Sequence, residues 1–181
     1  MNDSEFWKLI DASCSESAGD VEGQVAVLVR ELCLMPVEEI MSYERLFVRY
    51  LDDAYDERLW AAGCILDELS DHGFLDFRAW LVSRGKDFYV KCQRDPDELA
   101  AINVSDGRVT AEEMSAVAGR AYRAATGRDD FVALFSPRSP HPRIKNADFA
   151  WRTPEGYADP SVLRSSFPNL WARFGQHPRN R

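Results

Sequence analysis

Three residues near one predicted turn carry side chains that are suited to catalysis. Asp71 and His72 are adjacent, and Arg78 follows them among apolar neighbours. A carboxylate and an imidazole can transfer protons, and a guanidinium can hold a carboxylate or a phosphate with two hydrogen bonds. The structural alternative is a histidine without a role and an Arg that pairs with an acid, because buried charges are usually paired. The sequence favours this alternative for Arg78 and leaves all three residues as candidates for a catalytic site.

Four aromatic residues surround these candidates and are able to line a ligand pocket: Trp60, Phe74, Phe77 and Trp80. The last three recur every three residues, so they lie near one face of a helix. Aromatic residues with helical spacing are far more typical of a core than of a binding site. We therefore expect a core role for the four rings, with a ligand pocket as the alternative.

Three carboxylates, Asp52, Asp53 and Asp56, lie close together in the sequence. Such a group can share a proton or hold a hard cation. The spacing matches no known metal-binding loop, and the sequence has no close Cys or His pairs of the zinc-site type. We interpret the acids as a solvated face and predict no metal and no cofactor, while the sequence leaves open whether this cluster binds a cation. Nucleotide-binding and hydrolase fingerprints are also absent from the sequence.

The elements that position these residues are predicted to form a helical hairpin. Apolar residues with helical spacing indicate one helix from Asp56 to Leu69 and a second from about Phe74 to Arg84. The residues Ser70–Gly73 between them favour a turn, in which Gly73 can take a positive φ, and Gly85 fits the position after the second helix. The aromatic surface of this hairpin must be covered by the other helices.

Apolar residues with helical spacing predict further helices on both sides of the hairpin. These run from Asp3 or Ser4 to Ala12, from 21 to about 34, from Pro36 to about Ala54, from Lys86 to Arg94, from Asp95 to Ile102, and from Thr110 to about Thr126. Asp3 or Ser4 is expected to cap the first helix, and Thr110 and Glu113 are expected to form a capping box at the last. The residues from Asn103 to Val109 are predicted to be a loop.

The chain changes character after Gly127. Seven of the nine prolines lie beyond this residue, and proline at that density blocks long helices. Eight aromatic residues lie there as well, which is rare in a disordered tail. We predict an all-α fold: residues 1–127 form an irregular orthogonal helical bundle, and residues 128–181 form a long, Pro-rich, aromatic C-terminal arm packed on it as part of a single structural unit. Short helices are expected after Asp159 and from Pro168 to Phe174, and a frayed end is expected at 176–181.

The net charge of −8 is distributed unevenly along the chain. Residues 1–127 hold 13 Lys and Arg against 25 Asp and Glu, which gives −12, and residues 128–181 hold 9 against 5, which gives +4. The acidic body would repel a phosphate backbone, so nucleic-acid binding is disfavoured. We expect the basic arm to lie on the acidic body or to contact an acidic partner.

The sequence also limits where the protein works. It has no run of about 18 apolar residues, so we expect no membrane span. The first residues show no basic leader before an apolar run, which is not the pattern of a signal peptide. The four cysteines are widely spaced, as is typical of reduced cysteines in a cytoplasmic protein. We therefore expect a cytoplasmic protein whose oligomeric state the sequence does not indicate.

Four pieces of the sequence resemble a bacterial family. They are F-W-x-L-I-D at Phe6–Asp11, Y-x-x-x-L-W-A-A at Tyr55–Ala62, D-x-G-F-x-x-F-R-x-W-L-x-x-x-G at Asp71–Gly85 and P-x-L-W-A-R-F-G at Pro168–Gly175. The chain is similar in these pieces to the domain-of-unknown-function family 4240, which is mainly actinobacterial. The resemblance is weakest from 104 to 167, and His72 stands where the family often has an acid. It supports the architecture and implies no activity.

Two classes of function follow from these observations. The first is a non-catalytic protein-interaction or regulatory module in the cytoplasm, which fits the missing catalytic motifs, the acidic body and the folded-back arm. The alternative is a small enzyme, tailoring or hydrolytic, with Asp71, His72 and Arg78 at one concave site of the 70–78 hairpin. A pocket close to these three side chains would favour the enzyme.

Overall fold

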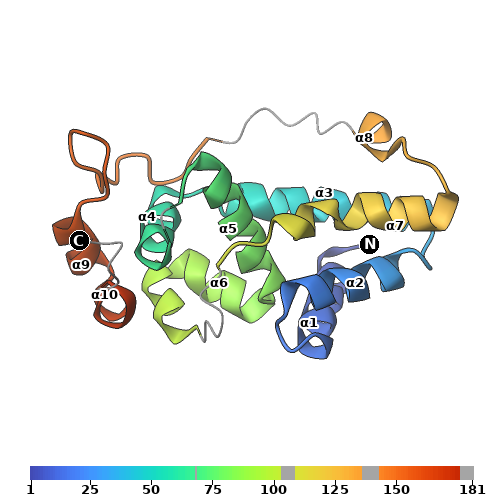
Figure 1. The fold of residues 1–181 in the computed structure, drawn as a ribbon, viewed down its shortest axis with the longest axis horizontal. Coiled ribbons are helices and arrows are strands. Elements are labelled where there is room, and N and C mark those ends of the chain that lie inside the picture. The colour runs from blue at the N-terminus through green and yellow to red at the C-terminus, as the bar shows by residue number, and fades with distance from the viewer. Residues whose placement is uncertain (68, 103–108, 136–142, 176–181) are drawn as a thin grey trace.

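The computed structural model describes residues 1–67, 69–102, 109–135 and 143–175, and it shows the predicted all-α fold (Figure 1). In these ranges the only extended pairings are two isolated bridges. The predicted end at 176–181 and most of the predicted loop from Asn103 lie outside the described residues.

From α1 to η1 the helices of the body follow one another with short connections. In chain order they are α1 (Asp3–Glu16), α2 (Val21–Leu32), α3 (Val37–Asp53), α4 (Glu57–Leu66), α5 (Asp71–Ser83), α6 (Lys86–Arg94), the 3₁₀ turns η1 (Pro96–Ala101) and η2 (Glu112–Ala116), and α7 (Val117–Thr126). The arm adds α8 (Phe131–Leu134), α9 (Pro160–Ser166) and α10 (Pro168–Phe174). Figure 1 shows α7 lying along α3, and α9 and α10 at the opposite end of the molecule from α8.

The first helix begins at Asp3, one of the two predicted positions, but its cap and its length differ from the prediction. Asn2, and not Asp3 or Ser4, caps it: the Asn2 side chain accepts hydrogen bonds from the backbone N–H groups of Ser4 and Glu5. The Glu5 carboxylate accepts from the Asn2 N–H at 2.8 Å, which completes a capping box. The helix then continues past Ala12 to Glu16.

The turn of the central hairpin also differs from the prediction. The Ser70 hydroxyl accepts from the N–H of Gly73 at 3.1 Å, so Ser70 caps α5 and the helix already begins at Asp71. Gly73 is therefore a helical residue in the first turn of α5, and its expected role in the bend was wrong. The positive φ lies instead at Gly85, where it is +95° and separates α5 from α6 as expected.

The capping box predicted at Thr110 and Glu113 does not form. The turn η2 begins at Glu112 with Ala111 at the N-cap position, and no side chain caps it. The N–H of Ala111 instead donates to the carbonyl of Asp76 in α5 at 3.0 Å. This hydrogen bond to α5 lies just before the 3₁₀ turn η2, and α7 begins only at Val117.

Four stacked rings form the centre of the body, and we call them the ring row: Trp60, Phe74, Phe77 and Trp80. Successive ring centroids lie 4.8, 6.2 and 5.8 Å apart, and none of these residues is more than 8% exposed. Gly63 makes this packing possible, because a Cβ there would lie 2.6 Å from Leu69 and 3.3 Å from the Phe77 ring. The aromatic surface of the hairpin is therefore buried, as predicted.

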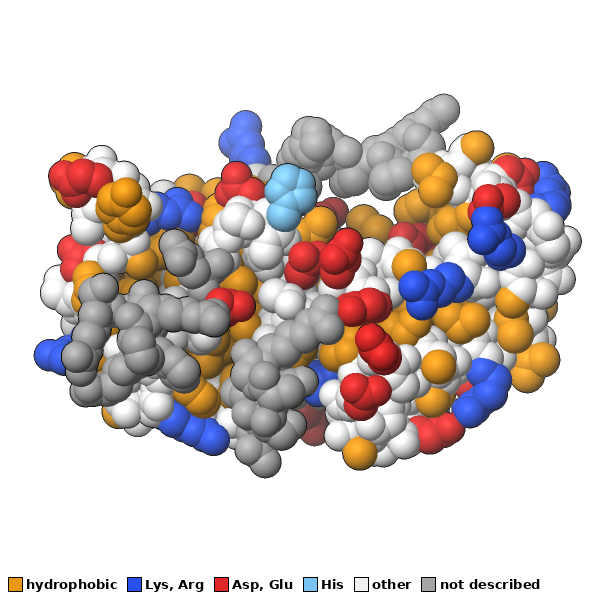
Figure 2. Space-filling view, in the orientation of Figure 1, with side chains coloured by type: hydrophobic (Ala, Val, Ile, Leu, Met, Phe, Trp, Pro, Cys, Tyr) orange, Lys and Arg blue, Asp and Glu red, His pale blue; other side chains and the backbone are white. Residues whose placement is uncertain are grey.

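The surface of the body is acidic, as the sequence composition requires. Figure 2 shows acidic side chains gathered across the middle of the visible face. Among the described helices, none combines the length and the apolar character needed to cross a membrane.

Glu44 is a polar exception in the inward stripe of α3. It lies at helical spacing from Ile40, Phe47 and Leu51, all of which are buried. Its Oε2 atom is buried without a hydrogen-bond partner. Because burial removes water from the charged form, it raises the pKa of the Glu44 carboxyl to about 7.

The Glu44→Gln variant should be less sensitive to pH than the wild-type chain. The pKa of Glu44 in the folded state is above its ordinary value of 4.5. The contribution of the protonated Glu44 to the free energy of unfolding is therefore fully present below pH 4.5. That stability is lost as the pH rises through about 7. Urea unfolding at pH 8 should show the variant more stable by on the order of 1–3 kcal/mol. At pH 4.5 the difference should be small. Glu38→Gln, an exposed change in the same helix, is the control, and identical pH profiles for all three chains would contradict the account.

Candidate functional site

The structure does not bring the three predicted catalytic residues into contact. Asp71 and His72 lie exposed in the first turn of α5. Arg78 lies about two turns later and is 8% exposed. Among the described residues, no hydrogen bond or ion pair joins Arg78 to either of the other two.

Arg78 makes contacts within the core that differ from the expected ion pair. Its Nη1 donates to the carbonyl of Leu51 at 2.8 Å, and its Nε donates to that of Phe74 at 3.4 Å. The guanidinium also lies over the Tyr55 ring at 4.8 Å. Burial lowers the pKa of Arg78, and the nearby Asp52 carboxylate opposes this effect. Within the described part of the chain, no carboxylate lies within ion-pair distance of Arg78, so backbone and rings replace the predicted acid.

Arg78→Lys should destabilise the chain, because one ammonium cannot reproduce the bonds of the guanidinium from the same position. We expect the free energy of unfolding to fall by about 1–3 kcal/mol in urea titrations. Arg94→Lys, at an exposed position in α6, should change it by less than about 0.5 kcal/mol. Equal effects of the two substitutions would show that the buried contacts of Arg78 do not stabilise the core.

The predicted acidic cluster meets residues of the arm. Asp56 caps α4 through Oδ1, which accepts from the N–H of Arg58 at 2.8 Å. Its other oxygen accepts from Asn146 Nδ2 at 2.6 Å, and the ammonium of Lys145 lies 3.8 Å from Asp53. In the described ranges, no three His, Cys, Asp or Glu side chains converge as metal ligands. Two of the three acids, Asp53 and Asp56, therefore contact side chains of the chain itself.

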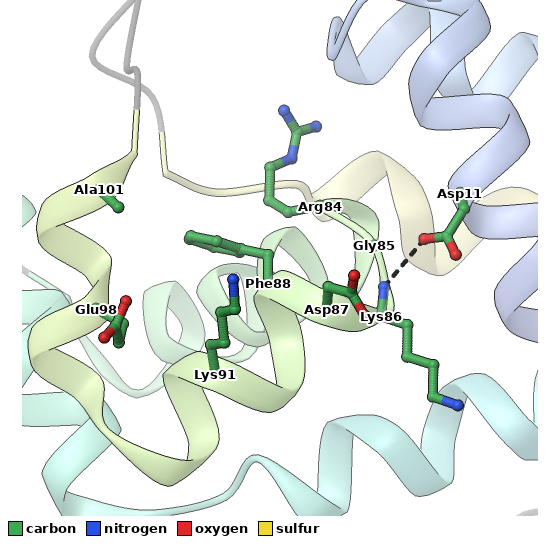
Figure 3. A pocket seen from close by; sticks show the side chains of 9 residues that line it. All are labelled: Asp11, Arg84, Gly85, Lys86, Asp87, Phe88, Lys91, Glu98 and Ala101. Atoms are coloured by element: carbon green, nitrogen blue, oxygen red, sulfur yellow. Dashed lines mark hydrogen bonds between the residues drawn. The ribbon is translucent and has the colours of Figure 1, made fainter.

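A cleft of about 420 Å³ opens where α1, α6 and η1 meet (Figure 3). None of the residues proposed from the sequence as catalytic or ligand-binding lines it. The described residues that line it are Asp11, Arg84, Gly85, Lys86, Asp87, Phe88, Lys91, Glu98 and Ala101. These residues come from separate segments, so no local motif could have indicated the cleft.

The apolar centre of this cleft is Phe88. Its half-buried ring meets Trp80 edge to face at a centroid distance of 5.9 Å, which joins the cleft to one end of the ring row. Figure 3 shows the Lys91 side chain beside Phe88, while the Lys86 side chain points away. The cleft therefore offers one aromatic surface with a cation directly beside it.

The beginning of α6 is held by a residue of α1. Gly85 occupies the N-cap position and supplies no side chain, so the carboxylate of Asp11 accepts the hydrogen bond from the Lys86 N–H at 3.0 Å. A Cβ on Gly85 would lie 2.5 Å from that carboxylate. Arg84, on the other side, donates to the carbonyl of Gly19 at 2.7 Å. These contacts fix the walls of the cleft, where the sequence predicted only the helix end at Gly85.

The described lining of the cleft is rich in charged side chains. Of the described lining residues, three are cationic and three are acidic, so these residues carry no excess of either charge. Among the described lining residues there is no Ser, Thr, Cys, His or Tyr. Cys92 on the same helix is fully buried, and burial raises the pKa of its thiol to about 12, which makes it a poor nucleophile.

Comparison with known proteins gives one family match. A family model described as "Protein of unknown function (DUF4240)" matches residues 1–124. No curated protein and no solved structure matches the chain. The matched residues include the ring row and the cleft, and three of the four resembling pieces lie among them. The fourth piece, Pro168–Gly175, lies beyond the match, as does the whole arm.

Proposed function

The chain belongs to the DUF4240 family of proteins of unknown function, and we propose that it acts as a cytoplasmic, non-catalytic protein-interaction module. In this proposal the cleft between α1, α6 and η1 binds a short segment of a partner protein. The finding that carries it is the lining of the cleft, in which charges of both signs surround a half-buried Phe88.

The composition of the cleft resembles that of a protein–protein interface. Such contacts combine an aromatic or apolar centre with a polar rim. A polypeptide segment supplies both charges and apolar side chains, so it can match acids and bases that alternate around one ring. Cys14, Cys33 and Cys92 are free thiols, which supports a reducing compartment.

The alternative of a small enzyme at the 70–78 hairpin has no comparable support. Asp71 and His72 point out at an exposed helix end, whereas Arg78 is engaged by the carbonyl of Leu51. A general acid or base needs its partners within hydrogen-bond distance. We therefore do not propose a reaction for these residues.

Two substitutions in the cleft test the proposed interaction. The tagged full-length chain is used to capture proteins from a lysate of its native cells, which are quantified by mass spectrometry. A partner enriched by the wild-type chain should fall at least tenfold with Phe88→Ala or Lys91→Glu, a loss equivalent to about 1.4 kcal/mol of binding.

The control is Lys8→Glu, which makes the same charge change at an exposed position of α1 outside the cleft. It should retain the partner. Capture of the same proteins in equal amounts by Lys8→Glu and Lys91→Glu would exclude the cleft as the binding site.

A further inference from the structure

A second surface of the body is already occupied by a segment of the arm. We call this segment the strap (residues 144–152). It pairs with the body in the manner of a short parallel strand: the N–H of Lys145 donates to the carbonyl of Tyr55 at 2.9 Å, and the N–H of Glu57 donates to the carbonyl of Lys145 at 3.0 Å. The backbone of the strap is thereby aligned with the start of α4.

The first side chains of the strap meet acids of the body. Asn146 donates to Asp56 at 2.6 Å, and the ammonium of Lys145 donates to the carbonyl of Asp53 and lies 3.8 Å from its carboxylate. Both strap residues are exposed, so these bonds lie at the rim of the contact. They set the register of the strap more than they add binding free energy.

The last side chains of the strap make its buried contact. Trp151 is 3% exposed, and its indole N–H donates to the Glu57 carboxylate at 2.6 Å. The Arg152 guanidinium lies 4.4 Å from the Trp60 ring centroid and 4.0 Å from that of Trp151, and 3.9 Å from Glu57. A cation between two indoles and beside a carboxylate is a favourable arrangement, because ring faces and acids both attract it.

The body side of this contact is an acid–ring face made of Asp53, Asp56, Glu57 and Trp60. All four residues lie within the family-matched stretch, whereas the strap lies outside it. Proteins often bind extended peptides in this way: main-chain hydrogen bonds align the peptide, and side-chain contacts give specificity. The face therefore has the features of a receptor, and the strap has those of its ligand.

The end of the arm also contacts the body through residues outside the strap. The buried carboxylate of Asp97 in η1 accepts from the N–H of Leu170 at 2.8 Å and from the Asn169 side chain at 2.7 Å, which caps α10. Leu163, Phe167 and Trp171 bury the apolar sides of α9 and α10. The strap also touches this end, because Phe149 packs edge to face on Phe167 at a centroid distance of 6.0 Å. The Asp97 cap is a second, separate attachment of the arm to the body.

From these contacts we infer that the acid–ring face is a binding site for an extended, basic peptide segment of the form K-N-x₄-W-R in a partner protein. The strap is its built-in competitor, so a partner binds only by displacing residues 144–152. This site is separate from the cleft at α6 and does not depend on the function proposed for that cleft.

The test uses the full-length chain with Lys145→Glu and Arg152→Glu. Both positions are exposed, so the change opens no cavity, and it places two acids against Asp53 and Glu57. A fluorescent peptide with the sequence of residues 143–153 is titrated with this variant and with the wild-type chain, and anisotropy is measured. The variant should bind the peptide at least tenfold more tightly than the wild-type chain, because its own strap competes less.

Two comparisons make the result specific. Adding Glu57→Lys to the variant should abolish binding, and a peptide with Ala in place of its Trp should bind at least tenfold more weakly. Lys8→Glu with Arg94→Glu makes the same charge change outside the strap and should behave as the wild-type chain. The inference is overturned if the variant binds the peptide no better than the wild-type chain, or if thermal unfolding shows that the variant no longer folds cooperatively.

Discussion

A continuous line of aromatic contacts connects the helices on which both proposed surfaces stand. It begins at Trp151 of the strap, whose ring centroid lies 6.2 Å from that of Trp60, passes through the ring row, and ends where Trp80 meets Phe88 at the cleft. Each ring is positioned by its neighbours, and such pairs stabilise a core beyond their simple burial. Gly63 sets the spacing, because the lack of a Cβ lets α4 and α5 approach closely enough for Trp60 to stack on Phe74. The acid–ring face and the cleft are thus opposite ends of one interior.

Carboxylates from distant segments hold the helices that border these surfaces. Gly85 and Phe167 stand at the N-cap positions of α6 and α10 and provide no capping bond. Asp11 accepts the free N–H of α6, and Asp97 accepts two N–H groups of α10. Because the first N–H groups of a helix have no partner inside it, each carboxylate satisfies a donor and also attaches one segment to another. The strap and the Asp97 cap are consequently two chemically different attachments of the arm to the body.

Local sequence patterns were sufficient for the helices and for the burial of the rings. The helix from Lys86 to Arg94 and the short helices beginning at Pro160 and Pro168 lie where spacing, glycine and proline predict them. The errors lie at helix ends. Ser70 caps α5, so Gly73 is inside the helix and not in the bend. The N–H of Ala111 bonds to a carbonyl of α5, and the predicted capping box does not form.

Contacts between distant segments could not be predicted from local sequence patterns. Asp11 and Lys86 are 75 residues apart, and no pattern in either segment marks them as partners. Arg78 was expected to need an acid, yet a carbonyl and two aromatic rings satisfy a guanidinium as well. From the charge difference between body and arm we expected the basic arm to lie on the acidic body or to contact an acidic partner. That expectation did not identify Glu57 and Trp60 as residues that contact the strap.

The most direct test of this account is the stability of Phe77→Ala, measured by urea unfolding of the full-length chain. Phe77 is fully buried in the middle of the ring row and belongs to neither proposed surface. If the rings are the common interior of the molecule, the free energy of unfolding should fall by about 3–5 kcal/mol, and tryptophan fluorescence and circular dichroism should report one shared transition. A loss below about 1 kcal/mol, or two separate transitions, would contradict the account.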